Sequence, residues 1–249
     1  MSPSPRKLVV GNWKMHGLSH ALHEAQALAD ALHAEPSPAR VAICPPATLI
    51  HRLAATMAEA HVEVGAQDCH AERQGAYTGD LGAEMLHDAG ASLVILGHSE
   101  RRARYRESDA LIADKVRAAL RAGLEPIICV GESADERRSG GALGVVLGQV
   151  AASLPSELAG RHFAVAYEPV WAIGSGLTPS LREIEEVHSA IRGALTGLDP
   201  HGAAPILYGG SVKPDNAVSI LRAVEVGGAL VGGASLTTAS FLPIVRAAG

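Results

Sequence analysis

Aromatic residues are scarce in this chain, and long apolar runs are missing. Among 249 residues there are two tryptophans, four tyrosines and two phenylalanines, so the core must consist mainly of Ala, Val, Leu and Ile. No apolar run is long enough and free enough of charge to span a bilayer. The N-terminal stretch "MSPSPRK" also lacks the apolar segment of a signal peptide. We therefore expect a cytoplasmic protein with no membrane partner.

Neither the charge nor the cysteines point to a nucleic acid, an anionic membrane or a metal. The formal net charge is −5, without a block of like charge, which argues against a polyanion as the main partner. Cys44, Cys69 and Cys129 are odd in number and widely spaced, so we interpret them as reduced structural thiols. The sequence predicts no metal site and no cofactor.

Short apolar segments alternate with amphipathic ones along the whole chain. Strands are predicted over residues 7–13, 41–44, 62–67, 92–97, 126–131, 163–168, 205–210 and 228–233. Most of them are continuously apolar, which is typical of a parallel sheet covered on both faces. Helices are predicted over residues 19–34, 108–122, 180–195 and 214–223. Three of these helices are expected to begin at capping side chains, namely Ser19, Ser108 and Asp215.

Eight strand–helix units in about 250 residues indicate a closed (β/α)8 barrel of parallel strands. With no linker, repeat or low-complexity tract in the sequence, we expect a single domain over residues 1–249. An open doubly wound sheet is the alternative. Such a sheet would normally carry a glycine-rich phosphate fingerprint after its first strand. Here the first strand runs into "GNWKMHG", which is neither that fingerprint nor a P-loop.

Polar side chains follow several predicted strands at the end where barrel enzymes carry their chemistry. Asn12 and Lys14 follow the first strand, His98 and Ser99 the fourth, and Glu168 the sixth. Each has a plainer explanation, such as a solvated lysine, a structural histidine or a glutamate paired with arginine. His98 differs because "SERR" after it predicts a helix start, where a neutral imidazole that donates a hydrogen bond is favoured. Other histidines in helical segments are expected to be surface or structural side chains: His20, His23, His33 and His188.

Two glycine-rich turns, "YGGS" at 208–211 and "VGGAS" at 231–235, follow the seventh and eighth strands. Tight glycine turns can leave backbone N–H groups pointing outward, as an anion site requires. Barrel enzymes commonly bind phosphate after these two strands. Together, the two turns predict a phosphorylated ligand.

Segments along the whole chain resemble, in order, those of the triosephosphate isomerase family. They are "GNWKM" (11–15), "GAQDCH" with "GAYTGD" (65–70, 75–80), "ILGHSERR" (95–102), "CVGE" (129–132), "AYEPVWAIGSG" (166–176), "EEVHSAIR" (185–192), "LYGGSVKPDN" (207–216) and "LVGGASL" (230–236). The resemblance implies interconversion of dihydroxyacetone phosphate and glyceraldehyde 3-phosphate through an enediolate. It also implies a glycolytic and gluconeogenic role without a cofactor.

The resemblance carries roles to matching positions. Glu168 matches the catalytic base, His98 the neutral electrophile, and Lys14 the cation that stabilises developing negative charge. Ser99 and Glu100 match supporting residues. The positions that match substrate contacts are Asn12, Lys14, Gly174, Ser211, Gly232 and Gly233.

A mobile lid and a subunit-contact loop are also implied by the resemblance. The lid comprises Pro169, Val170, Trp171, Ala172, Ile173, Gly174, Ser175, Gly176, Leu177, Thr178 and Pro179. The third loop, expected to reach a partner in a homodimer, contains Gln67, Tyr77, Thr78 and Gly79. The chain departs from the commonest family pattern at Ser175, Leu177, Asp68 and Asp80, where threonine, lysine, asparagine and glutamate are usual.

Two other classes of function remain as alternatives. A different phosphate-binding barrel is one, but a Schiff-base aldolase needs a barrel lysine, and only Lys7 and Lys14 lie near strands. A metal-dependent epimerase would need inward-facing His and Asp ligands on several strands, which the sequence does not show. A non-catalytic barrel scaffold is the other, but it would have no reason to keep Lys14, His98 and Glu168 together.

Overall fold

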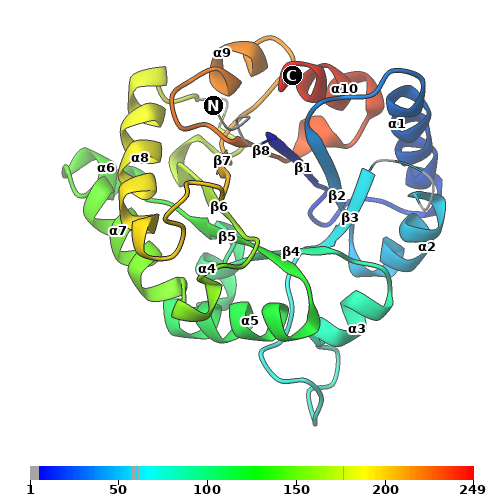
Figure 1. Ribbon diagram of the computed structural model, residues 1–249, viewed down its shortest axis with the longest axis horizontal. Helices are drawn as coiled ribbons and strands as arrows, with labels where there is room; N and C mark the ends of the chain where they lie inside the picture. The colour runs from blue at the N-terminus through cyan, green and yellow to red at the C-terminus, as the bar shows by residue number, and fades with distance from the viewer. Residues whose placement is uncertain (1–5, 58–59, 61, 176) are drawn as a thin grey trace.

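Eight parallel strands close into a barrel in the computed structural model, which describes residues 6–57, 60, 62–175 and 177–249 (Figure 1). The strands are β1 Leu8–Asn12, β2 Arg40–Cys44, β3 Val62–Ala66, β4 Leu93–Leu96, β5 Glu125–Val130, β6 Ala164–Tyr167, β7 Ile206–Tyr208 and β8 Gly228–Val231. Each strand pairs with the next, and β8 pairs with β1 to close the ring. The predicted barrel is confirmed. Seven of the eight strands end one or two residues earlier than predicted, because their last residues turn into the loops that form the site.

Helices surround the barrel on its outside, as the ring of labelled helices in Figure 1 shows. The α-helices are α1 Leu22–Ala34, α2 Ala47–Met57, α3 Ala83–Asp88, α4 Ser99–Tyr105, α5 Asp109–Ala122, α6 Ala134–Arg138, α7 Ala142–Ser153, α8 Leu181–Ala194, α9 Ala217–Leu221 and α10 Thr238–Arg246. The short 3-10 helices are η1 Ser19–Ala21, η2 Ser156–Leu158, η3 Val170–Ala172, η4 Leu195–Gly197 and η5 Gly233–Ser235. Within the described residues, none of the helices combines the length and apolar character needed to cross a membrane.

The helix starts agree only in part with the sequence prediction. Ser108 caps α5 as expected, because its hydroxyl accepts the Leu111 N–H at 3.2 Å. The prediction for Ser19 is wrong, since its hydroxyl instead accepts a hydrogen bond from Arg52 and a 3-10 turn precedes α1. The prediction for Asp215 is also wrong. The capping position of α9 is Asn216, whose side-chain oxygen accepts the Lys213 N–H and thereby closes the preceding loop.

Both faces of the strands are buried, which explains their continuous apolar sequences. In β1, Leu8 and Val10 belong to the cluster inside the barrel, whereas Val9 packs in the layer between strands and helices. Small side chains recur inside, because eight strands leave little room there. The inner cluster consists of Leu8, Val10, Ala42, Cys44, Leu93, Ile95, Ile127, Cys129, Ala164, Ala166, Leu207 and Leu230. All three cysteines are free and buried, as predicted.

Candidate active site

Glu168 directly follows β6 and is only 1% exposed, although a strand-end carboxylate would ordinarily be solvated. Its backbone N–H donates to the Val130 carbonyl at 2.7 Å, which extends the pairing between β5 and β6 by one residue. Two glycines allow this close packing. A Cβ atom at Gly131 would lie 1.7 Å from the Glu168 carbonyl oxygen, and one at Gly209 would lie 3.0 Å from its Cγ. The backbone of the barrel therefore fixes the position from which the Glu168 side chain extends.

The Glu168 carboxylate is held by two consecutive residues at the start of α4. The Ser99 N–H donates to Oε2 at 2.8 Å, and the Ser99 hydroxyl donates to Oε1 at 3.2 Å. The Nε2 of His98 lies 2.9 Å from Oε1. An arginine partner was the plainer explanation for Glu168, but among the described residues its partners are these hydrogen-bond donors.

The hydrogen bonds of His98 fix the tautomer of its neutral ring. His98 is the N-cap of α4, and its Nδ1 accepts the Glu100 N–H at 3.2 Å. Since Nδ1 acts as an acceptor, the neutral ring carries its proton on Nε2. That N–H is the one directed at Glu168. His98 thus directs Nε2 at Glu168 from a helix start, and its role as a neutral donor stays a prediction.

Lys14 has a left-handed backbone, with φ of 52°, which is uncommon for a residue other than glycine. Two side chains hold it there. Asn12 Oδ1 accepts the Lys14 N–H at 3.0 Å, and Gln67 Nε2 donates to the Lys14 carbonyl at 2.9 Å. The Lys14 ammonium donates to Glu100 Oε1 at 2.8 Å. Such local strain is kept where a function needs it.

The residues predicted to bind substrate converge on one cavity of about 300 Å³. Six predicted residues and the electrophile line it: Asn12, Lys14, His98, Gly174, Ser211, Gly232 and Gly233. Glu168 lies directly behind Gly209, another lining residue. The cavity therefore brings Lys14 and His98 together with the glycine turns, and Lys14 Cε would lie 3.6 Å from a Cβ atom at Gly232.

Burial disfavours the thiolate form of Cys69 and Cys129. Burial, reinforced by the neighbouring Glu168 carboxylate, raises the pKa of Cys129 well above its usual range. Burial likewise raises the pKa of Cys69 to about 12. Thiols with such pKa values stay protonated at neutral pH. Across the residues that the structure describes, no group of three His, Cys, Asp or Glu side chains could hold a metal ion.

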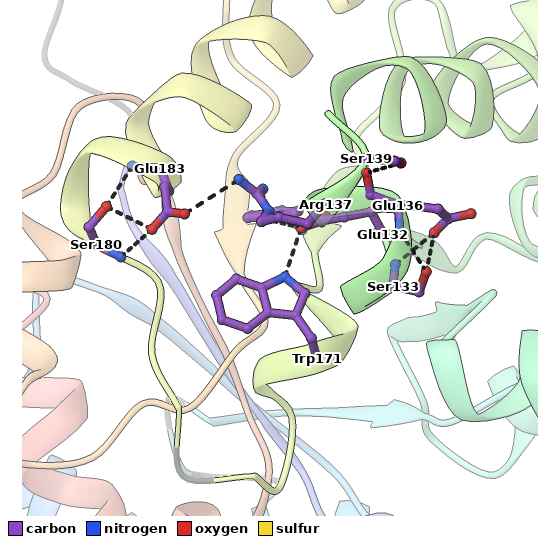
Figure 2. A network of polar contacts seen from close by, with 9 residues as sticks. Glu132, Ser133, Glu136, Arg137, Ser139, Trp171, Ser180 and Glu183 are labelled. Atoms are coloured by element: carbon purple, nitrogen blue, oxygen red, sulfur yellow. Dashed lines mark hydrogen bonds and ion pairs between the residues drawn. The ribbon is translucent and has the colours of Figure 1, made fainter. Parts of the chain in front are cut away.

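The first part of the predicted lid rests on a buried carboxylate, Glu132, which follows β5 in the "CVGE" segment (Figure 2). Glu132 Oε1 accepts hydrogen bonds from Trp171 Nε1 at 2.9 Å and from the Tyr167 hydroxyl at 3.1 Å. Arg137 Nε donates to the same oxygen at 2.7 Å. Further along the lid, the Ser175 hydroxyl donates to the Trp171 carbonyl at 2.9 Å. Gly176, also predicted to belong to the lid, lies outside the described residues.

The loop between β3 and α3 projects beyond the ring of helices at the bottom of Figure 1. His70 organises it, since its ring centre lies 4.1 Å from that of Tyr77 and its backbone N–H donates to the Leu81 carbonyl at 2.8 Å. Tyr77 remains 45% exposed. Thr78 and Gly79 follow Tyr77 in a turn that the Asp80 N–H closes on the Tyr77 carbonyl at 3.0 Å, whereas Gln67 directly follows β3 and holds Lys14.

Several functional residues were missed from the sequence. Lys213 and His16 line the cavity, and Trp13 donates its indole N–H to the Ser235 carbonyl at 3.1 Å. Lys213, two residues after the "YGGS" turn, was the only one with a recognisable signal, a cation beside a predicted phosphate site. Arg137 and Glu132 were also missed as lid supports, because only the folded chain brings the end of β5, α6 and the lid together.

Comparison with known proteins assigns the chain to a family. The triosephosphate isomerase family model matches residues 7–248. Triosephosphate isomerase of Caulobacter vibrioides is 57% identical over 248 residues, covering 99% of this chain and 98% of the relative. That of Ruegeria pomeroyi is 54% identical over 245 residues, covering 97% of each. The crystal structure of triosephosphate isomerase from Bartonella henselae superposes with a TM-score of 0.90 at 42% identity, covering 97% of this chain and 98% of that one. The chain belongs to the triosephosphate isomerase family.

Proposed function

We propose that this isomerase interconverts dihydroxyacetone phosphate and glyceraldehyde 3-phosphate by moving one proton between neighbouring carbons with its own side chains. The convergence of Lys14, His98 and the glycine turns on one cavity, with Glu168 buried beside it, carries the proposal. The reaction needs a base for a carbon-bound proton, donors for the resulting enediolate, and a phosphate site. Neither a metal nor a cofactor is required.

Glu168 is the base in this proposal. It removes the proton from the carbon beside the carbonyl and returns it to the neighbouring carbon. The hydrogen bonds from Ser99 hold the carboxylate behind Gly209, so its side chain has to rotate toward the cavity before it reaches substrate. Carboxylate oxygens within about 3 Å of the reacting proton are what general-base catalysis requires.

His98 and Lys14 stabilise the enediolate. The proton on His98 Nε2 is available for a substrate oxygen once Glu168 has moved. Lys14 supplies positive charge from the loop that follows β1, where Asn12 and Gln67 fix its backbone. Donors that are already oriented need no reorganisation as charge develops, which makes this arrangement effective.

The phosphate group is bound by Gly174, Ser211, Gly232 and Gly233. Backbone N–H groups in glycine turns are well suited to a phosphate dianion. Because the phosphate group does not itself react, its binding contributes free energy that can be used to stabilise the transition state at the reacting carbons.

The segment 169–179 is proposed to close over the bound substrate. An enediolate phosphate exposed to water can eliminate its phosphate group and form methylglyoxal. Closure also excludes water from the hydrogen bonds that stabilise the enediolate. Val170 and Leu177 are exposed apolar side chains in this segment, as expected of one that covers a site in another state.

A homodimer formed through the β3–α3 loop is the proposed assembly. Met15 is 94% exposed, and Leu18, Tyr77 and Leu81 are exposed as well. Met15 and Leu18 lie in the loop after β1, and Tyr77 and Leu81 lie in the β3–α3 loop; large exposed apolar side chains of this kind are typical of a protein–protein contact. The root of the loop is anchored by Asp68, which forms ion pairs with Lys115 at 2.8 Å and Arg101 at 2.8 Å.

The proposed setting is a single catalytic domain over residues 1–249, acting in glycolysis and gluconeogenesis in the cytoplasm. A coupled assay of both directions in the presence of a chelator tests the activity. We expect full turnover under these conditions, with inhibition by a phosphohydroxamate that mimics the enediolate. Turnover that depends on added metal would contradict the proposal and favour a metal-dependent barrel enzyme such as the epimerase alternative.

A further inference from the structure

The lid has two ends, and a chain of polar contacts runs between them (Figure 2). The first end contains Trp171, in η3. The second end runs into Ser180, the N-cap of α8. Trp171 at the first end contacts Glu132, and Ser180 at the second end contacts Glu183. A cation between these two carboxylates would link the two ends of the lid. Figure 2 shows Arg137 in that place.

At the first end, the contacts are short and partly buried, with Glu132 fully buried. Arg137 Nε donates to Glu132 Oε1 at 2.7 Å, and Trp171 Nε1 donates to the same oxygen at 2.9 Å. The guanidinium carbon of Arg137 also lies 5.8 Å from the centre of the Trp171 ring. Among the described residues, the other oxygen of Glu132 is buried without a hydrogen-bond partner. Arg137 and the Tyr167 hydroxyl, which donates to the same oxygen at 3.1 Å, therefore orient Glu132 and with it Trp171, and Arg137 is the charged partner of the two.

At the second end, Glu183 has two separate tasks. Its Oε2 accepts hydrogen bonds from the N–H and the hydroxyl of Ser180, both at 2.8 Å, in a capping box. Its Oε1 lies 3.7 Å from Arg137 Nη1. One carboxylate thus fixes the helix start that terminates the lid and also pairs with the cation that supports the lid's beginning.

We propose that Arg137 is a positioning residue that couples the two ends of the lid, through Glu132 to Trp171 and through Glu183 to Ser180. The coupling keeps the second end in register with the first, so that the segment moves as one unit over the phosphate. This inference rests on the proposed function of residues 169–179 as a lid.

The test uses Glu183→Gln. Glutamine can still accept the Ser180 hydrogen bonds of a capping box, but it cannot form an ion pair with Arg137. Glu136→Gln is the matched control, because Glu136 caps Ser133 in the same way at the start of α6. Arg137→Gln is less suitable, since it would leave Glu132 buried without its cation and could prevent folding.

Two measurements report on the coupling. Acrylamide quenching of tryptophan fluorescence in the free protein reports mainly on Trp171, because the other tryptophan, Trp13, is buried. The dissociation constant for glycerol 3-phosphate, a phosphate monoester that cannot react, reports on closure. Partly exposed ion pairs are weak, so the expected effects are modest. We expect the quenching constant and the dissociation constant for glycerol 3-phosphate each to rise about two- to fivefold in Glu183→Gln and to stay unchanged in Glu136→Gln. The melting temperatures of both variants should match that of the wild type.

Equal quenching and equal binding in Glu183→Gln and Glu136→Gln would overturn the coupling. Arg137→Lys, which keeps the charge but loses the planar fork, should give values above those of the wild type. Turnover of the wild-type chain tests the proposed function separately. Its absence would overturn the isomerase proposal, whereas the quenching experiment in the free protein would still decide whether Arg137 joins the two ends.

Discussion

The Nε2 of His98 lies 2.9 Å from Oε1 of Glu168, so the proposed proton donor and the proposed base are in contact before substrate is bound. Each group thereby fixes the other. The acidic N–H of His98 has an acceptor, and the carboxylate has a donor in a site from which water is largely excluded. Substrate must take the place of this contact, which presents its oxygens to His98 and its carbon-bound proton to Glu168.

Replacing His98 with glutamine tests the electrophile. Glutamine retains an N–H donor, but its position and acidity differ from those of imidazole. We expect kcat to fall about 100-fold or more, within the usual contribution of a positioned acid or base. Ser99→Ala is the comparison, since it keeps the backbone N–H bond to Glu168 and should affect kcat much less. A similar loss in both variants would assign His98 only a structural role.

Lys14→Met tests the proposed cation. Burial by itself would raise the pKa of the Glu100 carboxyl. The Lys14 ammonium, which donates a hydrogen bond to this carboxylate, outweighs burial and holds the pKa below its usual range. Removing the ammonium should lower kcat/KM about 100-fold or more, because a charge that stabilises the enediolate is lost. Unchanged kcat/KM, with the fold intact by circular dichroism, would exclude Lys14 from the reaction.

His188 makes stability depend on pH below neutrality. It is fully buried in α8, its Nδ1 lies 3.1 Å from the Glu225 carbonyl, and burial lowers its pKa from 6.5 to about 4. The unfolded chain therefore takes up this proton below pH 6.5, whereas the folded chain does so only near pH 4. Stability is fully present above pH 6.5 and is lost as the pH falls toward 4.

We expect His188 to account for about 2 kcal/mol of unfolding free energy lost between about pH 7 and pH 4.5. Urea unfolding at both pH values, at one protein concentration, measures this loss. His188→Gln should show a pH dependence that is shallower by that amount. His33→Gln, at an exposed position in α1, should keep the wild-type dependence. Identical slopes in all three proteins would remove His188 as the cause.

Tyr77 tests the proposed homodimer. Replacing this exposed aromatic side chain at the projecting loop with serine should raise the dimer dissociation constant about 10-fold or more, as loss of a central aromatic contact does in other interfaces. Light scattering over a dilution series measures the effect. Val224→Ser, an exposed apolar position elsewhere on the surface, is the control. A wild-type chain that is monomeric at all concentrations would contradict the homodimer itself.

Much of the fold was predictable because a strand buried on both faces leaves a continuous apolar segment in the sequence, and eight such segments alternate with helices. The predicted strand ends were less accurate, because glycines such as Gly209 and Gly232 can occupy either the last position of a strand or the first position of a turn. The Ser19 cap failed because a long-range partner, Arg52, takes its hydroxyl.

The candidate site was predictable where a residue type is unusual for its place, as for Glu168 at a strand end and His98 before a helix. Ser99 and Glu100 were predicted as supporting residues, but other supporting contacts were not predictable. The contacts of Gln67 with Lys14, and of Arg137 with Glu132, join parts of the chain that only the closed barrel brings together. Gln67 and Glu132 lie in the recognised segments "GAQDCH" and "CVGE", but sequence spacing carries no signal for their partners.

The central claim is that Glu168 moves the proton, and Glu168→Asp tests it most directly. The shorter side chain keeps the charge but withdraws it by about one methylene, and a displacement of that size can cost about 100-fold in rate. Isomerase turnover and deuterium incorporation from D2O into dihydroxyacetone phosphate should be followed together by NMR. We expect both rates to fall about 100-fold or more while KM changes little. Wild-type rates of turnover and deuterium incorporation in Glu168→Asp would contradict the role of Glu168 as the base.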